Sequence, residues 1–217
     1  YDRLYRFFSA LSLGHARRVV FMGGSITTGY AASPPLKSGW AARTGSWLKH
    51  FAAGHGAELS VLNRGVSGTD SASAVFRMKL HALELQANLL ILEFGINDQW
   101  LDPALRLQTW EACIRMAMAD PERAVLAIFL HERDQTGLVQ GLSPTAAEMA
   151  WICDYYQVPW LCPQEDSTAL PASLFPAHDP IHPNQAGHEE IARHCTAFLR
   201  ARAHEAQTAP TAGLGQD

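Results

Sequence analysis

A serine, an aspartate and a histidine are the residue types in this chain that most resemble a catalytic set. Ser25 follows a short apolar run and a pair of glycines, and Asp179 and His182 lie three positions apart in a turn-forming His-Asp-Pro-Ile-His segment. A serine hydroxyl is a weak nucleophile unless a base accepts its proton, and a carboxylate can hold one imidazole nitrogen while the other faces the serine. The set therefore predicts nucleophilic chemistry if the fold brings Asp179 and His182 to Ser25.

Each of these residues also has a purely structural interpretation. Ser25 can cap a helix after a glycine-rich turn, Asp179 can initiate an Asp-Pro turn, and His182 can cap the last helix. Sequence spacing alone leaves both interpretations open.

Two further loops follow apolar runs of the same kind. They are Asn-Arg-Gly-Val-Ser-Gly at residues 63–68 and Glu-Phe-Gly-Ile-Asn-Asp at residues 93–98. Taken alone, each is a turn with asparagine or aspartate chemistry. If the preceding runs are parallel strands, Gly65 offers a backbone N–H and Asn97 a side-chain amide at the same sheet edge as Ser25.

Other kinds of site are disfavoured by the same loops. No GxxxxGK[ST] or GxGxxG motif opens a helix here, and Thr27 takes the second glycine position of the GxSxG elbow. His178, His182, His188 and His194 gather near the C-terminus, but no HExxH motif is present, and His188 and His194 are expected on different faces of a helix. We expect neither a metal nor an organic cofactor.

Five short apolar runs alternate with helical patterns and must position these residues. We expect strands over residues 18–22, 58–63, 88–94, 124–130 and 158–162, whose unbroken apolar character is typical of strands buried on both faces. The spacing of apolar residues predicts helices over 1–13, 40–51, 75–83, 107–117, 143–156 and 184–204. The fourth long internal pattern opens with Ser143-Pro144, a cap residue and then proline.

This alternation predicts an α/β fold, a three-layer α/β/α sandwich around a five-stranded parallel sheet, because parallel neighbours need crossover connections. The strand order 2-1-3-4-5 is the commoner one, although periodicity does not determine order. We expect a single domain over residues 1–204, with the N-terminal helix over 1–13 packed on the sheet. Residues 205–217 lack large apolar side chains apart from one leucine and are expected to form a disordered tail.

The composition excludes several classes of protein. Of the 217 residues, 47% are hydrophobic and 18% charged, which supports a substantial core. A net charge of −4 argues against nucleic-acid binding, and no apolar run reaches the ~18 residues of a membrane span. Four separated cysteines without a CxxC pair indicate buried thiols of a reducing compartment, with two disulfides as the alternative. No signal peptide is visible, so we expect a cytoplasmic protein, although the chain begins at Tyr1 rather than Met.

Four blocks, taken together and in order, resemble the SGNH (GDSL-like) hydrolases, which have a flavodoxin-like fold. The blocks are Gly-Gly-Ser-Ile-Thr at 23–27, Asn-Arg-Gly-Val-Ser-Gly at 63–68, Gly-Ile-Asn-Asp at 95–98 and Asp-Pro-Ile-His-Pro at 179–183. Each block is weak alone, but the four span nearly the whole domain and fall at expected strand ends or in the last turn. The first block departs from the Gly-Asp-Ser-Leu of the family name at positions that are not catalytic.

The resemblance implies a role for each residue singled out above. It implies Ser25 as the nucleophile, His182 as the base and Asp179 as the group that orients the base. It further implies an oxyanion hole made of the Ser25 and Gly65 backbone N–H groups and the Asn97 side chain. The expected function is that of a serine esterase acting through an acyl-serine intermediate.

The nature of the substrate is a separate expectation. The Gly-Gly-Ser-Ile-Thr and Glu-Phe-x-x-Asn-Asp blocks resemble a branch associated with carbohydrate esters, and short connecting loops favour a small, acetyl-like acyl group. Gly24 and Trp100 are candidate substrate contacts; Trp100 can stack on a sugar ring or pack against a helix. The expected partner is a small-molecule or saccharide ester, and the oligomeric state is left open. The alternatives are a lysophospholipase or thioesterase with a longer acyl pocket, an O-acetyltransferase, and a non-catalytic carbohydrate-binding domain.

Overall fold

A five-stranded parallel sheet forms the centre of the molecule. The computed structural model describes residues 2–133, 141–163 and 172–208. The strands are β1 (Arg17–Gly23), β2 (Leu59–Asn63), β3 (Leu89–Glu93), β4 (Ala124–Ile128) and β5 (Trp160–Leu161), in the order β2-β1-β3-β4-β5. The five expected strands and the expected 2-1-3-4-5 order are confirmed, although β5 is shorter than its apolar run.

Helices surround the sheet in the described residues. They are α1 (Asp2–Ser12), α2 (Ser25–Thr28), α3 (Pro35–Ser38), α4 (Trp40–Gly54), α5 (Ser71–Met78), α6 (Gly95–Asp98), α7 (Pro103–Met118), α8 (Pro144–Tyr155) and α9 (Gln185–Thr208). A π-helical turn, η1 (Lys79–Leu83), continues α5, and a 3₁₀ turn, η2 (Ala172–Leu174), precedes α9. The short helices α2, α3 and α6 were not predicted, because four residues show no hydrophobic period.

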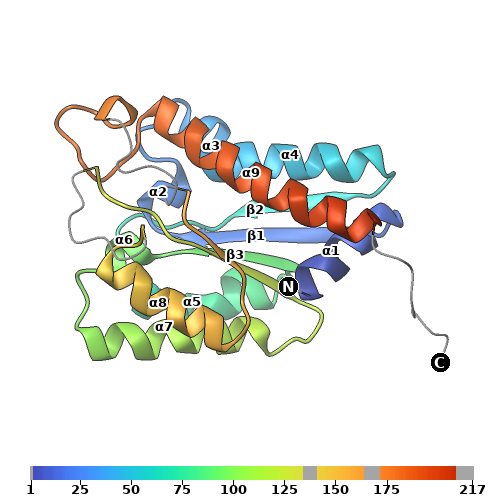
Figure 1. The fold of residues 1–217 in the computed structure, drawn as a ribbon, viewed down its shortest axis with the longest axis horizontal. Helices are drawn as coiled ribbons and strands as arrows, with labels where there is room; N and C mark the ends of the chain where they lie inside the picture. The colour runs from blue at the N-terminus through green and yellow to red at the C-terminus, as the bar shows by residue number, and fades with distance from the viewer. Residues whose placement is uncertain (1, 134–140, 164–171, 209–217) are drawn as a thin grey trace.

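The helices form two layers, one on each face of the sheet. Helices α1, α4 and α9 cover one face, and α5, α7 and α8 cover the other (Figure 1). Alternate residues of β1 belong to the two cores: Val19 and Phe21 pack on the α4 side, Val20 and Met22 on the α7 side. This is the predicted three-layer sandwich, with strands buried on both faces.

A buried tryptophan anchors each core. Trp40 meets Phe21 edge to face, with ring centroids 5.4 Å apart, on the α4 side. Trp110 fills the α7 side, where its indole N–H donates to the Met149 carbonyl at 3.0 Å, so that burial leaves the polar end of the ring satisfied.

Two helix ends test the sequence analysis directly. The Ser143 hydroxyl accepts from the Ala146 N–H at 3.1 Å and Pro144 is the first residue of α8, as predicted. Helix α9 continues to Thr208, four residues past the expected end at 204, and residues 209–217 of the expected tail lie outside the described residues. The division into one domain and a disordered tail stays a prediction.

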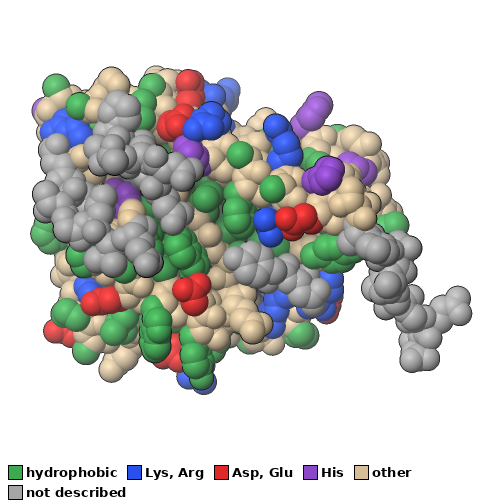
Figure 2. Space-filling view, in the orientation of Figure 1, with side chains coloured by type: hydrophobic (Ala, Val, Ile, Leu, Met, Phe, Trp, Pro, Cys, Tyr) green, Lys and Arg blue, Asp and Glu red, His purple; other side chains and the backbone are tan. Residues whose placement is uncertain are grey.

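The structure also bears on the predictions about cysteines, surface charge and membrane-spanning helices. Cys113, Cys153, Cys162 and Cys195 are all buried free thiols, so the disulfide alternative is wrong. Lys and Arg side chains lie among acidic and hydrophobic ones on the face drawn in Figure 2. No helix in the described part of the chain combines the length and the apolar character needed to cross a bilayer.

Candidate active site

The carboxyl ends of β1, β2 and β3 carry the first three sequence blocks to one edge of the sheet. Helix α2 begins at Ser25 directly after β1, and helix α6, which contains Asn97, follows β3. Figure 1 shows α2 and α6 at the same end of the sheet, next to the loop that leads into α9. Ligands of open parallel sheets bind at this edge.

The structure joins Ser25, His182 and Asp179 by hydrogen bonds. Ser25 Oγ lies 2.8 Å from His182 Nε2, and His182 Nδ1 lies 2.8 Å from Asp179 Oδ2. Because a carboxylate can only accept, Nδ1 carries the proton of a neutral ring and leaves Nε2 to accept from the serine hydroxyl. The arrangement can therefore withdraw a proton from Ser25, which is what an attacking serine requires.

The structure also bears on the structural alternatives for Ser25 and Asp179. Gly24, not Ser25, occupies the cap position of α2. Asp179 does form a turn, since its Oδ1 accepts from the N–H groups of Ile181 and His182 at 2.9 and 3.0 Å, but its other oxygen meets the imidazole. Partial burial works against the charge of Asp179, yet these N–H groups and the His182 ring hold the pKa of the carboxyl below its ordinary value.

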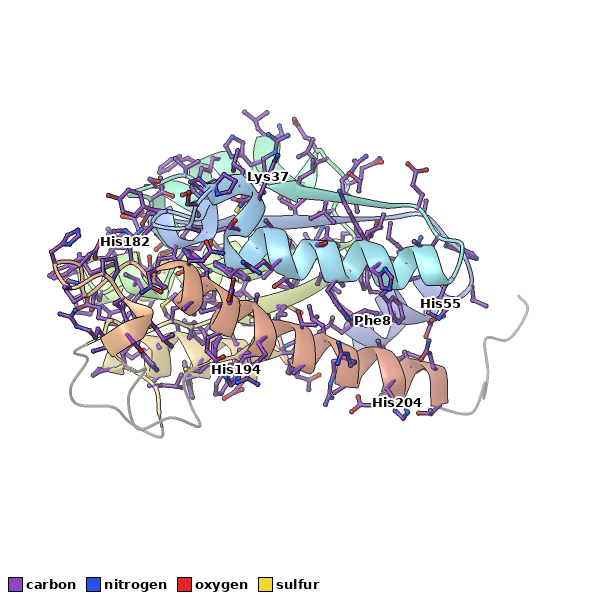
Figure 3. The ribbon with its side chains drawn as sticks, turned by 90° about the horizontal axis from the view of Figure 1, so that it is seen from above. Phe8, Lys37, His55, His182, His194 and His204 are labelled. Carbon is purple, nitrogen blue, oxygen red and sulfur yellow. The ribbon has the colours of Figure 1, made fainter. Side chains whose placement is uncertain are left out.

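His182 is partly open to solvent and is flanked by an aromatic ring. Its side chain is about one-fifth exposed, and the Tyr30 ring lies over it with centroids 4.4 Å apart. Figure 3 shows His182 at one end of the molecule, with His194 and His204 farther along α9. A ligand can thus reach the imidazole beside Tyr30, whose own side chain is half exposed.

Three N–H donors at this sheet edge are expected to stabilise an oxyanion, and they differ in the hydrogen bonds that they make in the structure. The Ser25 N–H is the first of helix α2, a position that has no partner within a helix. One Asn97 amide hydrogen is donated to the Thr69 carbonyl at 2.7 Å, which leaves the second available. The Gly65 N–H donates to Asn63 Oδ1 at 2.9 Å, so it is already engaged inside the protein, an arrangement that the sequence analysis did not predict.

Two glycines are required by close packing around this edge. A Cβ on Gly24 would overlap Asn97 Nδ2, so glycine lets the amide lie against the turn before Ser25. A Cβ on Gly65 would come within 2.8 Å of the Thr28 backbone nitrogen. Gly24 therefore borders the site through its backbone, and its expected contact with substrate stays a prediction.

Trp100 lies on the surface just beyond α6. Its side chain is 74% exposed, which excludes the interpretation that it packs inside the fold. An exposed indole close to Asn97 in the chain is available to an external ligand, as the sugar-stacking interpretation requires.

Two of the other C-terminal histidines, His188 and His194, have structural partners. His188 is fully buried; its Nδ1 accepts from the Trp40 N–H at 3.2 Å, and its Nε2 lies 2.8 Å from the Tyr30 carbonyl. His194 lies 3.1 Å from Glu190. His188 thus fastens the start of α9 to the segment that follows α2.

A buried carboxyl at the end of β3, close to helix α2, was not singled out by the sequence analysis. Glu93 ends β3 and accepts from the Thr27 hydroxyl at 2.8 Å, directly behind helix α2. Burial raises the pKa of Glu93 to about 7, with Asp98 adding to the rise and the Thr27 hydroxyl and Gly24 N–H opposing it. The signal for this group was an acidic residue at the end of an otherwise apolar strand.

Glu93 should make stability fall as pH rises towards neutrality. Its folded-state pKa lies above the ordinary value of 4.5, so the folded protein binds more protons than the unfolded chain between these values. The stabilisation is fully present below about pH 4.5 and is lost as pH rises through about 7, a change of roughly 3 kcal/mol at most. Asp98, whose pKa burial also raises to about 7, acts in the same direction.

Urea unfolding at pH 5, 6, 7 and 8 measures this effect. In Glu93→Gln the decline in the free energy of unfolding should be shallower than in the wild type, with the Asp98 share remaining. If the free energy of unfolding falls equally with pH in both proteins, Glu93 titrates as an ordinary carboxyl.

The fold and the Ser-His-Asp arrangement together are those of the SGNH hydrolases. The sequence model of the GDSL-like Lipase/Acylhydrolase family matches residues 21–190. The chain belongs to this family. No curated protein matches the sequence significantly.

Solved structures show the same fold. A two-domain esterase (CEX) active on acetylated mannans, co-crystallised with mannopentaose, is 25% identical with a TM-score of 0.81, over 98% of this chain and 56% of that one. A putative GDSL-like lipase from Parabacteroides merdae is 17% identical (TM-score 0.71; 88% of this chain, 98% of that one). A catalytic mutant of Axe2, an acetylxylan esterase from Geobacillus stearothermophilus, is 21% identical (TM-score 0.67; 88% and 96%). The chain thus spans about half the length of the two-domain esterase.

Proposed function

We propose that this chain is a serine esterase that removes a small acyl group, such as acetyl, from a carbohydrate ester. The observation that carries the proposal is the hydrogen-bonded series Ser25–His182–Asp179 at the open edge of the sheet. The substrate class is supported by the similarity to an esterase active on acetylated mannans and to an acetylxylan esterase.

In the proposed mechanism, Ser25 attacks the ester carbonyl while His182 Nε2 accepts the hydroxyl proton. His182 then gives this proton to the departing sugar oxygen, leaving an acyl group on Ser25. Water, deprotonated by the same nitrogen, attacks the acyl-serine and releases the acid and the free serine. Asp179 keeps the ring oriented and stabilises the imidazolium that forms.

The negative charge that develops on the carbonyl oxygen needs donors that are already in place. The Ser25 N–H and the second Asn97 amide hydrogen are the proposed first two. The third, the Gly65 N–H, would be shared between Asn63 Oδ1 and the oxyanion, because the substrate-free protein already uses it.

Replacing Asn97 with alanine should lower kcat by about 10²–10³-fold, the usual effect of losing one oxyanion donor. KM should change little, because the donor matters most once the charge has developed. Steady-state kinetics with p-nitrophenyl acetate give both values. If the variant keeps most of its turnover, Asn97 does not belong to the oxyanion hole.

Substrate choice is tested by varying the acyl chain and the alcohol separately. Serine-dependent hydrolysis of p-nitrophenyl esters should fall steeply from acetate to butyrate and octanoate; flat or rising rates would favour a lysophospholipase or thioesterase. Trp100→Ala should raise KM for acetylated mannan or xylan oligosaccharides and leave p-nitrophenyl acetate unaffected. Equal effects on both substrates would argue against sugar stacking, and acetyl transfer to added sugars in competition with water would indicate an acetyltransferase.

A further inference from the structure

Arg77, on helix α5, contacts the segments at the carboxyl ends of β1, β2 and β3 that meet at the candidate active site. We propose that Arg77 is a positioning residue that holds the oxyanion hole in its working geometry. The inference rests on the proposed function, since it concerns donors whose role is itself proposed.

The guanidinium makes three hydrogen bonds that reach the last residue of β1 and the loop after β2. Nη1 donates to the Arg64 carbonyl at 2.7 Å, and Nη2 donates to the Gly23 carbonyl at 3.1 Å and to the Thr69 hydroxyl at 3.0 Å. The guanidinium carbon also lies 5.7 Å from the centre of the Phe94 ring, which precedes the Asn97 helix. Arg77 therefore links the end of β1 to the loop after β2 and packs against Phe94, the residue between β3 and α6.

The bond to Arg64 acts on the Gly65 donor directly. The Arg64 carbonyl and the Gly65 N–H belong to one planar trans peptide, so they point in opposite directions. Holding the oxygen fixes the direction of the N–H. A cation on the oxygen also polarises the peptide and makes its N–H a stronger donor.

The other two hydrogen bonds of Arg77 act indirectly on the Asn97 amide and the Ser25 N–H. Thr69 receives Arg77 on its hydroxyl and Asn97 on its carbonyl, so the same residue connects the guanidinium to the side-chain amide. Gly23 lies two residues before Ser25 and directly precedes Gly24, against which Asn97 packs. Arg77 is thus connected to the Gly65 N–H through one peptide group, to the Asn97 amide through Thr69, and to the Ser25 N–H through Gly23 and Gly24.

The charge of Arg77 is not neutralised by a neighbouring carboxylate. The acceptors named above are uncharged, and no acidic side chain within the described residues lies within ion-pair distance of this half-buried guanidinium. Its Nη1 also lies 3.3 Å from His81 Nδ1, a ring whose pKa is lowered first by burial and then by the charges of Arg77 and Arg64. The positive charge is therefore available to the site where negative charge develops in the reaction.

The test compares Arg77→Met, Arg77→Lys and a matched control, Lys79→Met. Lys79 is an exposed cation two residues farther along, paired with Glu84 at 3.7 Å, so its removal changes the net charge equally without touching the loops. We measure kcat and KM for p-nitrophenyl acetate, the rate at which a fluorophosphonate labels Ser25, and Tm. Arg77→Met should lower kcat and the labelling rate by about 10- to 100-fold with KM nearly constant, and Lys79→Met should leave both rates unchanged.

Arg77→Lys separates positioning from mere stability. Lysine keeps the charge but cannot span three acceptors in a fixed plane, so its rates should lie between those of wild type and Arg77→Met. If Arg77→Met unfolds, the lysine variant carries the test by itself. A labelling rate within twofold of wild type in a folded variant would overturn the proposal.

A double mutant shows whether Arg77 works through the oxyanion hole. The combined loss in Arg77→Met with Asn97→Ala should be smaller than the product of the single losses, because both act on the same donors. Fully multiplicative losses would overturn the proposal. The fluorophosphonate labels Ser25 without any sugar or acetyl group. If the wild type is labelled but hydrolyses no acetyl ester, the proposed substrate is wrong, and the role of Arg77 is then tested by the labelling rates alone. If wild type is not labelled, both proposals fail.

Discussion

Replacing Ser25 with alanine should reduce kcat for p-nitrophenyl acetate by about 10⁶-fold, the largest effect expected of any single substitution here. The variant has no oxygen to form the acyl intermediate, whereas the oxyanion donors and the fold stay intact. Kinetics of wild type and variant side by side, with fluorophosphonate labelling of each, give the measurement.

The matched control for this substitution is Ser67→Ala. Ser67 lies on the neighbouring loop, with its hydroxyl 3.4 Å from that of Thr28, and the variant should keep normal turnover. Adding His182→Ala to Ser25→Ala should cost little more, because the two residues act as one unit. A covalent adduct that still forms on the Ser25→Ala protein would refute the nucleophile assignment.

Asp179→Asn should lower kcat by about 10⁴-fold although it changes one atom. In the wild type, the Ile181 and His182 N–H groups donate to Asp179 Oδ1. In the variant, the amide oxygen takes this place, because only an oxygen can accept these two hydrogen bonds. The amide nitrogen then faces His182 Nδ1 and forces the ring proton onto Nε2. In that tautomer the histidine cannot accept the proton of Ser25.

Kinetics with p-nitrophenyl acetate and the fluorophosphonate labelling rate should both show this loss. Asp154→Asn is the control, since it removes the same charge from the surface of α8 and keeps the acceptor for the Trp160 indole N–H. A loss smaller than tenfold in Asp179→Asn would mean that the carboxylate does not set the tautomer.

The fold could be predicted from local pattern because the strands are buried on both faces. The sequence of β3 and β4 is apolar almost throughout, which is typical of strands covered by helices on both faces. The short helices α2 and α6 gave no such signal, because one turn of helix is specified by its surroundings. Strand order likewise depends on contacts between distant segments.

Some residues of the candidate site could likewise be identified from the sequence, and others could not. Ser25, Asp179 and His182 were identifiable because each stands in a short motif whose local chemistry is informative. Glu93 and Arg77 were not, since the importance of each depends on loops that only the folded sheet edge brings to it. The engagement of the Gly65 N–H by Asn63 is a matter of rotamer and loop geometry, which sequence spacing does not encode.

The anchoring of α9 by His188 has a consequence for synthesis on the ribosome. The sheet edge that holds Ser25 can assemble from the first two-thirds of the chain, but His182 and His188 both arrive with the last segment. The buried imidazole docks that segment by bridging Trp40 and Tyr30, and the same event carries the base to the serine, 157 positions earlier in the chain. In the proposed mechanism, a nascent chain whose sheet has already formed still lacks its base, and hydrolysis begins only when α9 has docked.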